Sequence, residues 1–277
     1  MKKIAILGCG WLGLPLAKSL VDKGFSVKGS TTSEEKVSIL NNFGISAFQI
    51  ELTENYISGN ISSFLEDSEI LIIDIPPKLR GDSATAFGKT FVKKIQNLIP
   101  FIEESNVENV IFISSTSVYP DLLLENNNQN VYTEETRAAP NLENGRQLVE
   151  VEHLLQNNTN FKTNVIRFGG LIGEDRQPVR SLSGNKMLQN PSAPINLIHQ
   201  KDCIGIIETI IEKNAWNETF NAAAPFHPTR KEYYTQKAIE LNLAAPQFET
   251  SEPNFGKTIS SCKIDSILKY VFQKPML

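Results

Sequence analysis

Three glycines near the N-terminus have the spacing that a phosphate-binding turn requires. Gly8, Gly10 and Gly13 follow an apolar segment that predicts a strand, and they precede a segment that predicts a helix. In such a unit the first glycine permits a tight turn, the second lets the main chain approach a diphosphate, and the third lets helix and strand pack closely. The positive end of the helix then faces the phosphates. This turn, which contains Trp11 and Leu12, therefore predicts a nicotinamide dinucleotide site rather than a glycine turn without a ligand.

The end of the predicted second strand bears on which dinucleotide is bound. In this type of unit a carboxylate about twenty positions beyond the glycines bonds the ribose 2′-hydroxyl and selects NAD. Here that position is occupied by the hydroxyls of Ser30, Thr31 and Thr32, and Lys36 follows one turn into the next helix. Because no carboxylate at the strand tip repels a 2′-phosphate, we expect NADP, with NAD as the alternative. The same hydroxyls are also suited to capping the next helix.

Two further strand ends are expected to contact the cofactor. Asp74 and Pro76 end the predicted fourth strand, where they should touch the dinucleotide through the main chain, and the proline stiffens the loop. Arg167 precedes two glycines and is suited to hold an anion of the cofactor or substrate. The alternative for Arg167 is an ion pair with a carboxylate such as Glu152.

Short apolar segments alternate with longer helical patterns over the first two thirds of the chain. Strands that are buried on both faces form continuous apolar runs, and their alternation with helices indicates a parallel sheet. The sequence therefore predicts an α/β fold with a doubly wound parallel Rossmann sheet. The predicted strands are 3–7, 26–30, 46–50, 69–75, 107–113 and 163–168, and the clearest predicted helices are 12–23, 87–105 and 141–156.

The pattern changes after residue 168. Glycines interrupt it, and an irregular stretch with proline and serine runs to residue 194. Two short strands, 195–198 and 219–221, then flank an apolar helix at 202–212, and 229–241 predicts a surface helix. We expect a Rossmann domain of residues 1–168, to which 195–224 return. Residues 169–194 and 225–277 should form a small substrate-side region.

Composition narrows the class of protein. The chain has 277 residues and a net charge of −4, so no basic face for nucleic acid is expected. Its three cysteines form no metal-ligand spacing or disulfide framework, so we predict no metal site and a reducing compartment. No segment resembles a signal peptide or a membrane span. We expect a cytoplasmic protein with a small-molecule substrate, no nucleic-acid or membrane partner, and scope for a homodimer.

Five segments together resemble the extended short-chain dehydrogenases/reductases of the NAD-dependent epimerase/dehydratase family. They occur in the order typical of that family and extend over nearly the whole chain, and the compact C-terminal part looks most like an atypical subgroup of it. The segments are 113–119 (ISSTSVY), 131–134 (VYTE), 167–173 (RFGGLIG), 198–202 (IHQKD) and 220–222 (FNA).

The resemblance implies a catalytic set that this chain has only in part. The family uses a serine or threonine at the end of the fifth strand, and a tyrosine and lysine spaced i, i+4 on one helix face for proton transfer. Ser115 falls at the serine position, but Asn144 and Leu148 fall at the tyrosine and lysine positions. Asparagine does not titrate, and leucine has no charge to lower a neighbouring pKa. The glycine turn also differs, because the family usually has GxxGxxG.

Other side chains are candidates for the missing roles. Tyr119 and Tyr132 lie on the loop above the carboxyl edge of the sheet, where either is placed to donate a proton, although packing is the preferred interpretation for each. His199, Arg176 and Arg180 are candidate substrate residues, with a structural histidine and surface charges as the alternatives.

Two hypotheses follow. The first is an NADP-dependent oxidoreductase or epimerase that acts on a small hydroxylated, sugar-like substrate through a non-standard proton donor. The second is a non-catalytic dinucleotide-binding sensor or regulatory module, motivated by Asn144 and Leu148.

Overall fold

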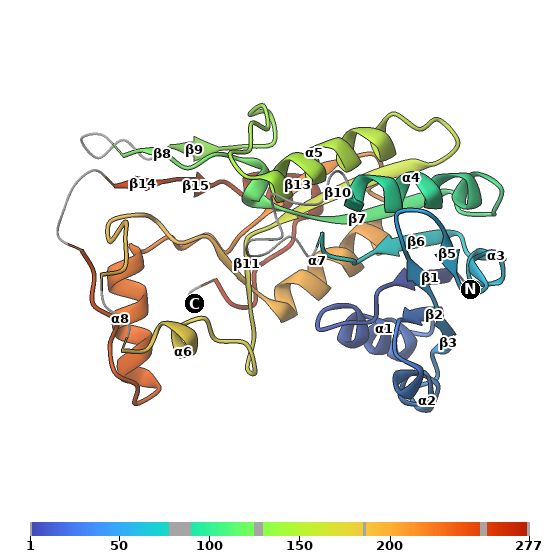
Figure 1. Ribbon diagram of the computed structural model, residues 1–277, viewed down its shortest axis with the longest axis horizontal. Coiled ribbons are helices and arrows are strands. Elements are labelled where there is room, and N and C mark those ends of the chain that lie inside the picture. The colour runs from blue at the N-terminus through green and yellow to red at the C-terminus, as the bar shows by residue number, and fades with distance from the viewer. Residues whose placement is uncertain (1, 78–89, 125–129, 185–186, 250–253, 276–277) are drawn as a thin grey trace.

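A seven-stranded parallel sheet forms the centre of the computed structural model, which describes residues 2–77, 90–124, 130–184, 187–249 and 254–275 (Figure 1). The strand order is β13-β10-β7-β6-β1-β2-β3. The strands are β1 (Lys3–Leu7), β2 (Ser26–Thr31), β3 (Ser46–Gln49), β6 (Ile70–Ile73), β7 (Asn109–Ser115), β10 (Lys162–Phe168) and β13 (Thr219–Ala222).

Helices cover both faces of this sheet, so the predicted doubly wound α/β fold is confirmed. Strands such as β1 and β6 are buried almost throughout, as their unbroken apolar sequences require. Separate apolar cores fill the two faces. One face packs against α1 (Gly13–Asp22), α2 (Glu34–Asn42) and α7 (Gln200–Lys213); the other packs against α3 (Ile61–Leu65), α4 (Thr90–Glu103) and α5 (Glu143–Gln156).

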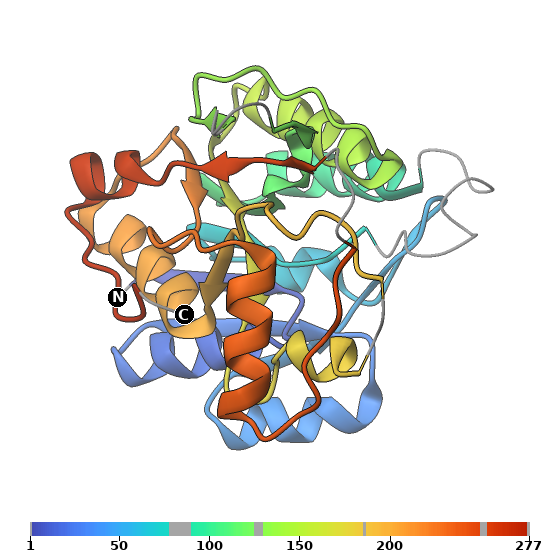
Figure 2. The same cartoon turned by 90° about the vertical axis from the view of Figure 1, so that its left-hand side faces the viewer.

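A smaller layer lies beyond the carboxyl edge of the sheet. It contains the parallel pair β11 (Gly170–Ile172) and β12 (Leu197–His199) with α6 (Val179–Leu182) and α8 (Arg230–Glu240). Figure 2 shows α8 standing across the front of the molecule. Tyr233 and Tyr234 of α8 join a third apolar core with residues of β11, β12 and α6. The stretch expected to be irregular up to residue 194 is therefore partly ordered into β11 and α6.

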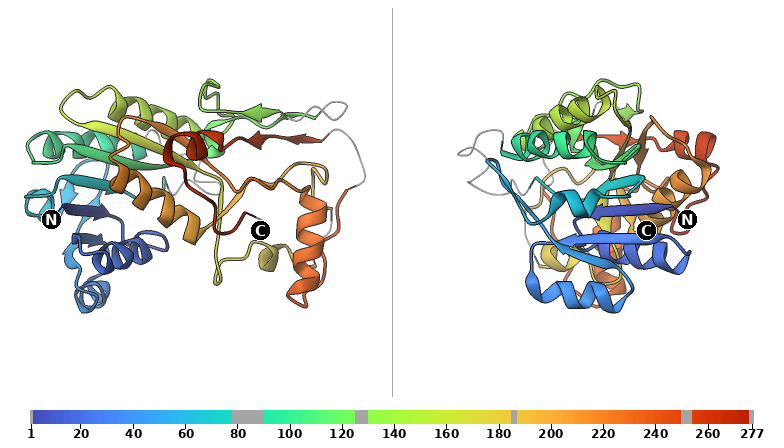
Figure 3. Two further views of the ribbon diagram at one scale, coloured as in Figure 1. Left: turned by 180° about the vertical axis from the view of Figure 1, so that it is seen from behind. Right: turned by 90° about the vertical axis from the view of Figure 1, so that its right-hand side faces the viewer.

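The C-terminal segment returns along the sheet, as the view from behind shows (Figure 3). Buried Asp202 holds it, because the carboxylate accepts hydrogen bonds from the Tyr270 hydroxyl (2.9 Å), the Gln273 amide (2.6 Å) and the Lys274 amide (3.1 Å). The remaining short elements are β4 (Glu51–Leu52), β5 (Ile57–Ser58), η2 (Thr116–Val118), β8 (Leu122–Leu123), β9 (Val131–Tyr132), β14 (Phe255–Gly256), β15 (Thr258–Ile259) and η3 (Ile264–Leu268).

Several boundaries differ from the sequence prediction. The fourth strand ends at Ile73, two residues earlier than expected, because the chain leaves the ladder before two prolines that cannot donate to it. Conversely, the fifth strand continues to Ser115. Residues 87–89 of a predicted helix lie outside the described residues. In the part of the chain that the structure describes, no helix has the length and apolar character needed to cross a membrane.

Candidate functional site

The glycine turn connects β1 to α1 at the carboxyl edge of the sheet. Gly8 has φ +110°, and a Cβ there would lie 2.4 Å from the Asp74 carbonyl oxygen. A Cβ at Gly13 would lie 2.2 Å from the Gly8 carbonyl oxygen. By contrast, a Cβ at Gly10 would meet no heavy atom within 4 Å. Two glycines are thus needed for packing, and the third leaves space in front of the main chain, as a bound diphosphate requires.

Main-chain donors face that open space. The Gly10 amide donates to the Gly8 carbonyl oxygen (2.8 Å), whereas the amides of Trp11 and Leu12 donate to no acceptor among the described residues. Both belong to the N-terminal end of α1, where the helix dipole favours an anion. The residues present therefore fit the diphosphate of a dinucleotide.

Ser30 at the end of β2 has a structural role. Its side-chain oxygen accepts a hydrogen bond from the Gly8 amide (2.9 Å), and its carbonyl oxygen accepts one from the Cys9 amide (2.8 Å). The side chain is buried. Ser30 therefore shapes the glycine turn from a buried position, and its role in holding a 2′-phosphate stays a prediction.

The other groups predicted for the 2′-phosphate lie closer to solvent. Thr32 and Lys36 are exposed, and Thr31 is buried, with its Oγ1 accepting a hydrogen bond from the Ser33 amide (3.1 Å). Ser33 is the residue before α2, but its side chain makes no capping bond to the helix. Of the predicted set, Thr32 and Lys36 are the groups with room for a ligand.

Asp74 lies directly beneath the glycine turn. Its amide donates to the Leu7 carbonyl oxygen (2.9 Å), so this main-chain group is committed to the turn. Burial raises the pKa of the Asp74 carboxyl to about 7, and a hydrogen bond from the Gly13 amide opposes this shift. Pro76 is exposed beyond it. The sequence predicted a main-chain contact here, but it did not indicate that a titratable side chain lies next to the start of α1.

Two neighbouring serines at the end of β7 have different surroundings. Successive strand residues point to opposite faces of a sheet. Ser114 is buried and donates to Glu152 Oε1 of α5 (2.5 Å). Ser115 is half-buried, and its oxygen accepts a hydrogen bond from the Ser117 amide (3.1 Å). That bond does not use the Ser115 hydroxyl proton, which is available for a substrate oxygen.

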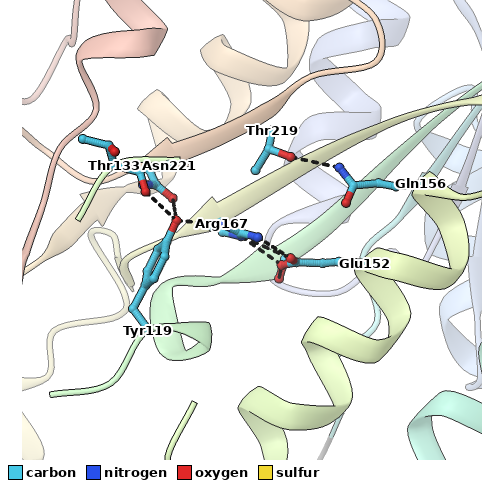
Figure 4. Close-up of polar contacts among 8 residues, drawn as sticks. Tyr119, Thr133, Glu152, Gln156, Arg167, Thr219 and Asn221 are labelled. Atoms are coloured by element: carbon cyan, nitrogen blue, oxygen red, sulfur yellow. Dashed lines mark hydrogen bonds and ion pairs between the residues drawn. The ribbon is translucent and has the colours of Figure 1, made fainter. Parts of the chain in front are cut away.

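A buried polar network lies under α5 (Figure 4). Ser114, Arg167 and Asn221 are register partners on the adjacent strands β7, β10 and β13. Arg167 Nη2 lies 2.6 Å from a Glu152 carboxylate oxygen, and its Nη1 donates to the Tyr119 hydroxyl (2.6 Å). Of the two alternatives for Arg167, the structure has the ion pair with Glu152.

The two candidate tyrosines pack against each other, with ring centroids 5.1 Å apart. The Tyr119 hydroxyl has three partners, because it also lies 3.0 Å from Asn221 Oδ1 and 3.1 Å from the Thr133 carbonyl oxygen. Burial raises the pKa of Tyr119, although Arg167 beside it opposes the shift. Tyr119 is therefore a member of the network. The Tyr132 hydroxyl is buried without a partner among the described residues, so its role as a proton donor stays a prediction.

The N-terminal end of α5 approaches the turn that follows Ser115. A Cβ at Gly145 would lie 2.5 Å from the Ser117 carbonyl oxygen, so glycine is required for this contact. Asn144 is half-buried at this end, and Leu148 is 3% exposed within the apolar core. Helix α5 thus brings positions 144 and 148 close to the turn after Ser115, as the resemblance implies. The side chains at these positions, Asn144 and Leu148, do not transfer protons.

A lysine from another part of the chain reaches the same turn. Lys257 Nζ donates to the Tyr119 carbonyl oxygen (2.6 Å) and lies 3.5 Å from an Asp121 carboxylate oxygen. Burial lowers the pKa of Lys257, and Asp121 opposes this. Sequence spacing gave no signal for this contact, because the lysine is more than a hundred residues from the turn.

Arg180 lies in the smaller layer, and so does His199, although residues 195–224 were expected to return to the Rossmann domain. His199 caps α7, since its Nδ1 accepts a hydrogen bond from the Lys201 amide (3.1 Å), and burial lowers the pKa of the imidazole. This supports the structural alternative for His199. Arg180 is exposed on α6.

Trp11 links the glycine turn to the smaller layer. Its indole nitrogen donates to Asp175 Oδ1 (2.9 Å), and the Arg176 guanidinium lies 4.9 Å from the ring centroid. Gln200 donates to the Trp11 carbonyl oxygen (2.7 Å). The sequence analysis did not single out Asp175 or Gln200, because each acts through a partner more than 150 positions away.

The sheet and its glycine turn define a Rossmann-type α/β fold. Among solved structures, UDP-N-acetylglucosamine 4-epimerase from Bacillus cereus has a TM-score of 0.77 at 17% identity, covering 99% of this chain and 92% of that chain. UDP-glucuronic acid 4-epimerase from Bacillus cereus, in complex with UDP-glucuronic acid and NAD, has a TM-score of 0.78 at 16% identity, covering 99% of this chain and 94% of that chain.

Sequence comparison identifies the relatives more closely. Protein YeeZ of Escherichia coli strain K12 is 32% identical over 278 residues, covering 99% of this chain and 97% of YeeZ. UDP-N-acetyl-D-mannosamine dehydrogenase of Methanococcus maripaludis is 29% identical over 125 residues, covering 42% of this chain and 29% of that protein. No protein-family model matches. The chain belongs to the YeeZ family. Its fold is that of solved epimerase/dehydratase and short-chain dehydrogenase/reductase structures, so the resemblance inferred from its sequence is confirmed at the level of the fold.

Proposed function

We propose that the protein binds a nicotinamide dinucleotide at the glycine turn and acts as an oxidoreductase or epimerase on a small hydroxylated, sugar-like substrate. The observation that carries this proposal is the pair of unbonded amides, Trp11 and Leu12, in front of the open space at Gly10. The solved epimerases named above act on sugar nucleotides, and one is in complex with NAD. When bound, the dinucleotide supplies hydride transfer, for which positioning provides much of the rate.

NADP is the proposed dinucleotide. Thr32 and Lys36 are exposed at the end of β2 without a carboxylate at the strand tip. Glu34 and Glu35 occupy the first turn of α2 and work against a 2′-phosphate, so Lys36 is the group on which the preference depends. Calorimetric titration with NADPH and NADH tests this directly. We expect tighter binding of NADPH and loss of the preference in Lys36→Ala; equal affinities would contradict it.

Ser115 is the proposed hydrogen-bond donor to the substrate oxygen. Sugars and ketones should be screened for turnover with NADPH, in the wild type and in Ser115→Ala. We expect turnover that falls in the variant while its affinity for NADPH stays the same. Absence of turnover with every compound would count against an enzyme.

A non-catalytic dinucleotide-binding module is the second candidate. Leu148 favours it, because this side chain is built into the apolar core and carries no catalytic group. If NADPH binds and changes association with a partner protein, while the double variant Asn144→Tyr, Leu148→Lys has no activity, this second candidate is supported. Turnover by the native protein would exclude it.

A further inference from the structure

The turn from Gly173 to Arg176 is docked on the glycine turn. Trp11 is the contact, and it bonds Asp175 across 164 positions of sequence. A Cβ at Gly173 would lie 2.8 Å from an indole ring carbon, so the main chain is in close contact with the ring. The smaller layer therefore contacts the glycine turn through the Trp11 side chain.

This docked turn is held in shape from several sides. Gly173 and Arg176 exchange two main-chain hydrogen bonds of 3.0 and 3.2 Å. Gln177 donates to the Gly173 carbonyl oxygen (2.7 Å), and Gln200 fixes the Trp11 carbonyl oxygen at the start of α7. The main chain that carries Arg176 and the main chain that carries Trp11 are thus each held by hydrogen bonds, and this supports the position of the Arg176 side chain over the indole.

Arg176 brings an unneutralised charge to this place. Its guanidinium lies over the indole and forms no ion pair with any carboxylate of the described residues. The neighbouring Asp175 side chain is bonded to the indole instead. A guanidinium stacked on an aromatic ring keeps its N–H groups free at the edge, where they suit the oxygens of a phosphate.

We propose that the 173–176 turn forms the outer wall of the dinucleotide site, and that Arg176, oriented by Trp11, pairs with the diphosphate that the Trp11 and Leu12 amides bind. This inference rests on the proposed function, because it requires a dinucleotide at the glycine turn. It assigns Arg176 to the cofactor, whereas the sequence suggested the substrate.

Binding of NADPH, ADP-ribose and adenosine to the purified full chain tests the proposal. Arg176→Gln should weaken NADPH and ADP-ribose about tenfold, since a charge-assisted hydrogen bond is lost, and should leave adenosine unchanged. Arg176→Lys should fall between, because it keeps the charge without the planar stack. Arg137→Gln, which removes an exposed arginine after β9, is the charge-matched control and should bind like the wild type.

Trp11 fluorescence provides an independent readout. The chain has two tryptophans, and Trp216 lines a cavity with Lys2 and Asn109 at the opposite edge of the sheet, so Trp216→Phe leaves Trp11 as the reporter. In that background Arg176→Gln should increase quenching of Trp11 by the neutral quencher acrylamide, and ADP-ribose should protect Trp11 at about tenfold higher concentration than when Arg176 is present.

The outcomes separate the inference from the function on which it rests. If the wild type binds no dinucleotide, the proposed function fails. If the wild type binds and Arg176→Gln binds NADPH and ADP-ribose within twofold of it, the function stands and the inference is overturned. Unchanged cofactor affinity with a raised KM for a substrate would also overturn it, because Arg176 would then serve the substrate's own anion.

Discussion

The polar groups in the two halves of the sheet's carboxyl edge differ in whether they are hydrogen-bonded within the described protein. At the β1–α1 turn, the amides of Trp11 and Leu12 donate to no described acceptor, and Gly10 leaves open space in front of them. Under α5, Glu152 and Arg167 are buried and bonded to each other. The β1–α1 turn has main-chain donors available for a ligand, whereas the polar groups under α5 are bonded to each other and stabilise the fold.

This difference shows which polar groups of the candidate site remain available for a ligand. Unpaired donors are costly when buried, so they persist where a ligand or water completes them. A buried ion pair that is fully bonded has no group left for chemistry, and Leu148 above it is apolar. Cofactor binding is therefore the half of the proposed function that the structure supports more directly.

The largest effect is expected from breaking the buried pair. Arg167→Leu leaves Glu152 as an uncompensated buried charge, which should lower the free energy of unfolding by about 3–5 kcal/mol. Urea denaturation measures this. Lys23→Leu removes a half-exposed partner of Glu208 and Glu212 and should cost about 1 kcal/mol or less. Equal losses in the two variants would contradict the distinction between a buried and an exposed ion pair.

Gly10→Ala probes the ligand half without disturbing the fold. The added Cβ meets no atom of the described protein, so the free energy of unfolding should change by about 0.5 kcal/mol or less. The methyl group would project toward the diphosphate, and we expect NADPH affinity to fall at least tenfold, or by about 1.4 kcal/mol. Calorimetry together with urea denaturation separates the two effects, and unchanged affinity would place the ligand elsewhere.

Asp74 makes the ligand half sensitive to pH. Its pKa is raised from 3.8 to about 7, so the folded state is progressively penalised as pH rises from about 4 to about 7. Asp74→Asn should therefore be more stable than the wild type above pH 7, by about 1–2 kcal/mol after allowance for partial solvent contact, and the difference should vanish near pH 4.

The same ionisation bears on cofactor binding. NADPH affinity of the wild type should fall as pH rises through 7, because a carboxylate then forms near the diphosphate, and Asp74→Asn should lack this dependence. Thermal unfolding and NADPH titration at several pH values measure both effects. Parallel pH profiles in the two proteins would contradict the assignment.

The neighbouring serines provide a contrast between two adjacent residues. Ser114→Ala removes a hydrogen bond to a buried carboxylate and should lower stability by about 1.5–3 kcal/mol. Ser115→Ala removes a half-exposed turn contact and should cost about 0.5–1 kcal/mol, but it should lower any turnover. If Ser114→Ala lost turnover while Ser115→Ala kept it, the roles of the two serines would be reversed.

Much of the fold was predicted correctly because the sequence patterns that indicate strands, turns and helices are local. Apolar runs, glycines and helix patterns gave the strands and the first helices within a few residues. Boundaries failed where prolines after β6 ended the ladder early, and where β11 and α6 formed in a stretch without a periodic pattern. For the site, the glycine turn lies at the β1–α1 connection and Ser115 at the end of β7, and their functional roles stay predictions. The sequence did not indicate that the Ser30 oxygen accepts a hydrogen bond from the Gly8 amide.

By itself the sequence determined that a glycine turn opens a parallel α/β sheet, and that Asn144 and Leu148 stand where a tyrosine and lysine are expected. Spacing along one chain segment carries that information. Only the tertiary structure decided that Arg167 pairs with Glu152, that Asp74 titrates beside α1, and that Arg176 lies over Trp11. These depend on burial and on contacts between segments distant in sequence, which no local pattern encodes.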